Sequence, residues 1–121
     1  MSAGARRWAV RLTAVAEADF LEILRWTMVQ FGETQARVYA ETLSAALTDL
    51  AAGPTVIGAR ERNDIAKGLC TLHVARKGRK GRHFLMFRIG RDRHGGVIEV
   101  LRILHDVMDL QRHLPPADKG V

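Results

Sequence analysis

Apolar residues in the first half of the chain recur with a helical period, after a short alternating segment at residues 8–12. The alternation predicts a strand with one buried face. Residues 14–30 then predict a helix, because Thr13 offers an N-cap hydroxyl and apolar side chains follow three or four positions apart. The expected core stripe of this helix consists of Ala16, Phe20, Ile23, Leu24, Thr27 and Phe31.

Gly32 interrupts this period and residues 34–52 resume it, so a second helix is expected to pack against the first as an antiparallel hairpin. Gly53 and Pro54 end the second helix, since glycine closes a helix readily and proline cannot continue one. Its apolar positions are Ala36, Tyr39, Leu43, Leu47 and Leu50.

Three strands are predicted in the second half, after a polar connector at residues 55–67 that has room for one short turn of helix. They are residues 69–75, residues 83–89 and a nearly unbroken apolar run that starts at residue 97. The last run indicates a strand buried on both faces, with Glu99 and Arg102 as its charged members. A loop at residues 77–81 and a Gly-Gly hairpin turn at residues 91–96 connect the three.

The predicted order is β-α-α-β-β-β, followed by a short helix at residues 109–113. This order indicates an α+β fold, an antiparallel sheet with the helical hairpin on one face. A chain of 121 residues fits one domain. Residues 1–7 are expected to be flexible, and residues 115–121 to form a tail.

Positive charge is concentrated in the second half of the chain. Residues 1–53 carry five Lys/Arg and six Asp/Glu, a net charge of −1, whereas residues 54–121 carry fourteen and seven, a net charge of +7. Such a field favours a polyanion or an acidic protein as partner, although a solvated loop kept soluble by its charge is the alternative. The densest stretch contains Arg76, Lys77, Arg79, Lys80, Arg82, Arg88, Arg91 and Arg93, against Asp92 alone.

Several other functional classes are not supported by the sequence. Cys70, the single cysteine, lies in an apolar segment, so a buried thiol in a reducing compartment is expected. Neither a signal-peptide core nor an apolar run of about 20 residues occurs, and we therefore expect a cytoplasmic protein. The histidines lack metal-ligand spacing and no Walker motif is present, so we expect no metal and no cofactor.

Leu21 and Met28 are seven residues apart and lie off the core stripe of the first helix. They are able to form a second apolar seam for a partner, although peripheral core packing is the more common explanation.

Short motifs along nearly the whole chain resemble the RelE/ParE family of bacterial toxin-antitoxin modules, and its ParE branch in particular. The matching segments are Leu12-Thr13-x-x-Ala16-x-x-Asp19, Ile23-x-x-Trp26, Phe31-Gly32, Gln35-Ala36, Tyr39 with Leu43, Pro54 with Gly58, Gly81-Arg82-His83, Arg102-Ile103-Leu104-His105 and Met108-Asp109-Leu110.

The resemblance implies a toxin held silent by a cognate acidic antitoxin, whose flexible segment wraps the hairpin and the sheet. ParE-like members are described as DNA gyrase inhibitors with no known catalytic step, and operator DNA is reached through the antitoxin complex. Gyrase inhibition is our first hypothesis. The residues expected to contact the antitoxin are Leu21, Met28 and Arg88, and those expected to bind the target or a polyanion are Arg76, Lys77, Arg79, Lys80, Arg82 and Arg102.

RelE-like members cleave messenger RNA on the ribosome, and this is the alternative hypothesis. RNA cleavage needs a base, an acid and positive charge at the phosphate. The candidates are His73 or His83 as base, His105 as acid, and Arg82, Arg88 and Arg102 as charge stabilisers. Two of them have plain structural alternatives. His105 is expected to be a satisfied structural histidine, and Arg102 is equally well explained by an ion pair with Glu99 or with a carboxylate on a neighbouring strand.

Overall fold

Two helices and five strands follow one another in the computed structural model, which describes residues 8–107. The helices are α1 (Ala14–Phe31) and α2 (Glu33–Leu50). The strands are β1 (Ala9–Leu12), β2 (Arg60–Glu61), β3 (Leu69–His73), β4 (His83–Asp92) and β5 (Gly95–His105). The expected helix at residues 109–113, the expected flexible segment at residues 1–7 and the expected tail at residues 115–121 lie outside the described residues.

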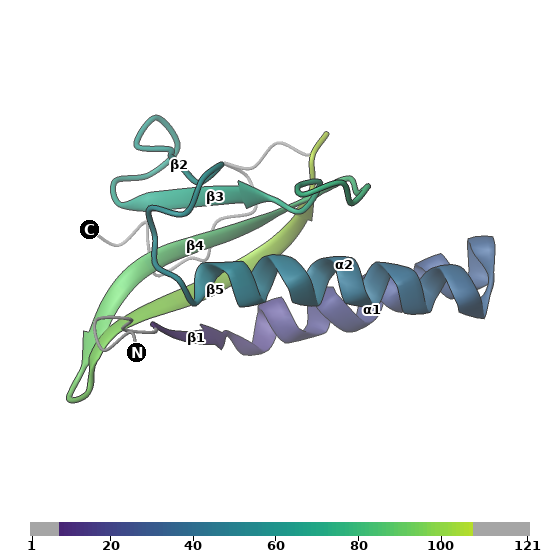
Figure 1. Cartoon of the computed structure of the whole chain (residues 1–121), viewed down its shortest axis with the longest axis horizontal. Coiled ribbons are helices and arrows are strands. Elements are labelled where there is room, and N and C mark those ends of the chain that lie inside the picture. Colours follow the sequence, from purple (N-terminus) through teal and green to yellow (C-terminus); the bar gives the residue numbers. More distant parts are fainter. Residues whose placement is uncertain (1–7, 108–121) are drawn as a thin grey trace.

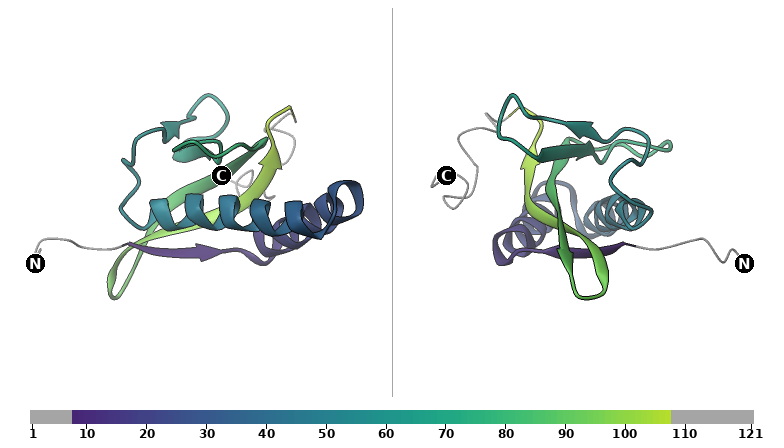
Figure 2. Two further views of the ribbon diagram at one scale, coloured as in Figure 1. Left: turned by 45° about the vertical axis from the view of Figure 1, so that its right-hand side comes forward. Right: turned by 90° about the vertical axis from the view of Figure 1, so that its left-hand side faces the viewer.

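The strands form one sheet in the order β1-β5-β4-β3-β2, and α1 and α2 lie along one of its faces (Figures 1 and 2). β3, β4 and β5 pair antiparallel, as predicted, and β2 pairs antiparallel to β3. β1 instead pairs parallel to β5, and the helical hairpin with the three intervening strands supplies the long connection that parallel neighbours require. The connector forms the two-residue strand β2 rather than a turn of helix, so the sheet has five strands and not four.

β5 is buried on both faces, which confirms the prediction for the apolar run. Ile98, Val100 and Ile103 pack in the main core under the hairpin. Leu101 and Leu104 pack on the opposite face of the sheet. A register shift between Met86 and Phe87 of β4 marks a bulge in the β4–β5 pairing.

Thr13 caps α1 as predicted, since its hydroxyl oxygen accepts a hydrogen bond from Ala16 N at 3.0 Å. The same hydroxyl donates to Leu101 O at 2.9 Å. One side chain therefore both starts the helix and attaches it to β5.

The prediction that Phe31 belongs to the core was wrong, because its side chain is 64% exposed. Figure 1 shows the distal end of the hairpin running past the end of the sheet. The apolar period of α1 thus continues where no sheet lies beneath it. No helix within residues 8–107 is both long and apolar enough to cross a membrane.

Candidate functional site: a polar cluster at the end of the sheet

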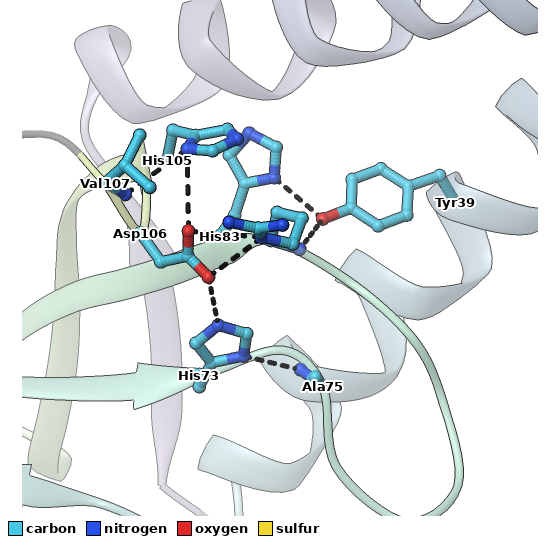
Figure 3. Close-up of polar contacts among 8 residues, drawn as sticks. Tyr39, His73, Ala75, His83, His105, Asp106 and Val107 are labelled. Atoms are coloured by element: carbon cyan, nitrogen blue, oxygen red, sulfur yellow. Dashed lines mark hydrogen bonds and ion pairs between the residues drawn. The ribbon is translucent and has the colours of Figure 1, made fainter.

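Six polar side chains meet where β3 and β5 end and β4 begins (Figure 3). Antiparallel pairing causes this, since it sets His83 opposite His105 and places His73 opposite Phe84. The hairpin contributes one member from α2. We call this group the end cluster, and it consists of Tyr39, His73, Arg82, His83, His105 and Asp106.

Asp106 connects one half of the end cluster. Its carboxylate accepts hydrogen bonds from His73 Nε2 at 3.0 Å and from Arg82 Nε at 3.2 Å. These bonds, the one from His73 first, hold the pKa of Asp106 below its usual value. Asp106 is therefore ionised, and its negative charge offsets the positive charge of Arg82.

Tyr39 connects the other half. Its hydroxyl oxygen accepts the Arg82 backbone N–H at 3.0 Å and lies 2.7 Å from His83 Nδ1. We assign the hydroxyl proton to this contact, with His83 Nδ1 as the acceptor, because the Arg82 N–H already donates to the same oxygen. Burial, and then the nearby His105, lowers the pKa of His83 to about 4, so this ring is neutral near pH 7. Burial also raises the pKa of Tyr39.

The hydrogen bonds assign a tautomer to each of the three imidazoles. His73 Nδ1 accepts from Ala75 N at 3.0 Å, and His105 Nδ1 accepts from Val107 N at 3.3 Å. His83 Nδ1 accepts from Tyr39. A neutral ring whose Nδ1 is an acceptor carries its proton on Nε2. In this arrangement no ring nitrogen of the cluster offers a free lone pair. No group of three metal-binding side chains occurs in the described part of the chain.

Two of the arginines proposed for RNA cleavage lie outside the end cluster. Arg102 donates to Asp19 of α1 through Nε at 2.8 Å and Nη2 at 3.0 Å. Asp19 is the last residue of the motif that begins at Leu12 and belongs to α1, so the expected partner on a strand was wrong. Glu99 pairs instead with Arg88, at 3.0 Å.

The cations of the β3–β4 loop differ in their availability. Arg76 is only 13% exposed and is held by Asp49 at 3.3 Å and by Ile57 O at 2.8 Å. Lys77 also binds Asp49, but its side chain is 66% exposed. Arg82, also in this loop, pairs with Asp106, whereas no ion pair within residues 8–107 involves Arg79 or Lys80.

Leu21 and Met28 are 61% and 49% exposed, so neither is core. Leu21 borders an open, mainly apolar groove of about 370 Å³ between the helices. The groove is lined by Leu12, Glu17, Phe20, Leu21, Ser44 and Leu47.

The sequence placed four members of the end cluster among its candidates and missed the roles of two. Tyr39 was expected to be an apolar position of the second helix, and Asp106 was not among the candidates. Asp106 in fact lies 3.5 Å from His105 and binds His73 on another strand. No sequence signal connects α2 with the ends of three strands, since that proximity exists only in the folded chain.

The same arrangement of elements occurs in known proteins. The sequence model of the family described as the ParE toxin of type II toxin-antitoxin system, parDE, matches residues 10–110. Toxin ParE1 of Mycobacterium tuberculosis is 33% identical over 103 residues, which cover 85% of this chain and 94% of that protein. Toxin ParE of Escherichia coli is 34% identical over 109 residues, covering 90% and 95%.

A solved structure described as the chromosomal ParDE TA system from P. aeruginosa superposes with a TM-score of 0.65. It covers 81% of this chain and 95% of that chain at 21% identity, which supports the fold. Together, the family match and the two toxins show that this chain belongs to the ParE toxin family of type II toxin-antitoxin systems.

Proposed function

We propose that this ParE-family toxin arrests growth by binding DNA gyrase in the cytoplasm, without catalysing a reaction, and that a cognate acidic ParD-like antitoxin neutralises it. The observation that carries the non-catalytic part is the state of the three imidazoles. His73, His83 and His105 each use Nδ1 to accept an internal hydrogen bond.

Cleavage of RNA would require one of these rings to remove a proton from the 2′-hydroxyl and another group to protonate the leaving oxygen. An imidazole whose lone pair is engaged is a poor base, and a neutral Nε2–H is a poor acid. Asp106 adds a negative charge beside Arg82, where the scissile phosphate would have to lie. The end cluster therefore supports the gyrase hypothesis over RelE-like cleavage.

We assign the antitoxin to the apolar seam of α1 at Leu21 and Met28, with Arg88 as a charged contact. The exposure of Leu21 and Met28, and the groove beside Leu21, support this assignment. For the target or another polyanion, we favour Lys77, Arg79, Lys80 and Arg82 among the predicted cations. Operator DNA would be reached only within the antitoxin complex.

An assay of purified toxin separates the two functions. We expect inhibition of supercoiling by purified gyrase, and no cleavage of messenger RNA in a translating extract. Translation-dependent cleavage with normal supercoiling would support the RelE-like alternative and refute the proposal. Absence of both activities, and of growth arrest, would indicate an inert family member.

The antitoxin assignment has its own test, with a matched control on the same helix. Leu21→Glu or Met28→Glu should weaken antitoxin binding by about tenfold or more, because each places a charge in an apolar contact. Val29→Glu is the control, since Val29 is 74% exposed on another side of α1. Equal losses for all three variants would contradict the assignment. Calorimetric titration measures the affinities.

A further inference from the structure

The groups of the end cluster that lack an internal partner are all hydrogen-bond donors. Because Nδ1 of His83 and of His105 accepts a bond, each ring carries its proton on Nε2. Among the described residues, the buried side-chain nitrogens without a hydrogen-bond partner are Nε and Nη1 of Arg76, of which Nε forms the ion pair with Asp49. The two Nε2–H groups are therefore in contact with solvent.

These donors lie close together. The rings of His83 and His105 are 5.2 Å apart between centroids and nearly perpendicular, at 78°. The Arg82 side chain is 65% exposed and uses Nε to bind Asp106. Its Nη groups make no hydrogen bond to the described residues, so they add further donors beside the rings.

We propose that Arg82, His83 and His105 bind a side-chain carboxylate of the acidic antitoxin, an inference that rests on the antitoxin part of the proposed function. A carboxylate supplies acceptors only and matches a surface of donors. Hydrogen bonds to a charged acceptor are also stronger than neutral ones.

The β3–β4 loop brings cations to the end cluster, whereas the hairpin and Asp106 bring carboxylates, and these carboxylates favour a single protein carboxylate over a nucleic-acid backbone as the ligand. Residues 14–50, which form the hairpin, carry two Arg and six Asp/Glu, a net charge of 2 − 6 = −4. Tyr39 brings this hairpin against the cluster, and Asp106 lies within it. A strand of nucleic acid would bring repeated phosphates towards these carboxylates, whereas an antitoxin segment can place a single carboxylate at the donors.

Occupancy of this site would also cover Arg82, one of the cations that we assign to the target. The antitoxin and the target would then compete for the same guanidinium. Competition at this point gives a direct route from antitoxin binding to neutralisation.

A pair of isosteric variants tests the proposed donor. His105→Asn retains an acceptor near the position of Nδ1 and loses the Nε2 donor, whereas His105→Gln retains a donor near Nε2. We expect about tenfold weaker antitoxin binding for His105→Asn, and recovery to within about threefold of the unaltered toxin for His105→Gln. His94→Asn, in the distant β4–β5 turn, is the control and should leave the affinity unchanged. Unaltered affinity in His105→Asn, or equal losses in both variants at position 105, would overturn the proposal.

A second measurement on the toxin alone does not depend on the antitoxin. Acetate is the probe, followed through the imidazole Hε1 resonances. The resonances of His83 and His105 should move together in a saturable titration, and that of His94 should not. Absence of this response would refute the carboxylate site, even if gyrase inhibition holds. If the unaltered toxin did not bind the antitoxin, the proposed neutralisation would be refuted, and the acetate titration alone would decide whether the carboxylate site exists. Displacement of acetate by an RNA oligomer at equal phosphate concentration would overturn the choice of a protein carboxylate.

Discussion

Arg102→Ala should destabilise the fold strongly, because Arg102 and Asp19 form a mostly buried ion pair between β5 and α1. Their side chains are 23% and 16% exposed. Two hydrogen bonds of 2.8 and 3.0 Å join them, and Asp19 also accepts the backbone N–H of Ile103 at 3.0 Å. Removing the guanidinium leaves a carboxylate that has lost its counter-charge in a largely desolvated position.

The size of the effect follows from this burial. Removing one partner of a buried ion pair costs about 3–5 kcal/mol. Since both side chains retain some contact with water, we expect about 2–4 kcal/mol here, discounted for solvent screening. For a domain of this size that corresponds to a fall in Tm of roughly 10 °C.

Urea denaturation and thermal melting measure this loss, with Arg25→Ala as the control. Arg25 pairs with Glu22 on α1, the helix that also carries Asp19. The Arg25 side chain is 67% exposed, so removing it should cost at most about 0.5 kcal/mol. If the two variants were equally stable, the assignment of Arg102 to the fold would be wrong. Combining Arg102→Ala with Asp19→Asn should be less damaging than the sum of the single changes, because both remove the same contact.

Two further predictions concern a close contact and acid stability. Gly96→Ala should lower the free energy of unfolding by about 1–3 kcal/mol, because an added Cβ would overlap the ring of Trp8. Gly90→Ala is the control and should be milder, since its Cβ would meet nothing closer than 4.0 Å. Chemical denaturation compares the two variants. The pKa of His83 is about 4 in the folded chain, below its ordinary value of 6.5. His83 therefore contributes stability that is fully present above pH 6.5, where the ring is neutral in both states. This contribution is lost as the pH falls from 6.5 towards 4. His83→Gln should remove about 1–2 kcal/mol of the pH dependence of stability, after allowance for solvent screening, in melting curves between pH 4 and 7. An unchanged pH profile would contradict the neutral, buried ring.

The helices and the long strands could be predicted from the sequence because their signals are local. Thr13 caps α1 through a neighbour three residues away, and the apolar period of α1 depends only on spacing along the helix. The same period misplaced Phe31, because spacing indicates a face and not whether anything lies against it. β2 was missed for a related reason, since a strand of two residues is defined by its partner β3 and not by its own sequence.

The sequence by itself determined the order of the elements, the apolar face of each helix, the basic second half and the resemblance to ParE toxins. The tertiary structure alone decided which charges are available for binding. Arg102 became a structural residue because Asp19, 83 positions away, lies against it. Asp106 met His73, and Tyr39 met His83, because antiparallel pairing and the docking of α2 brought four distant segments to one end of the sheet. Hydrogen bonds and tautomers depend on distances of about 3 Å across the fold, and local sequence does not specify such distances.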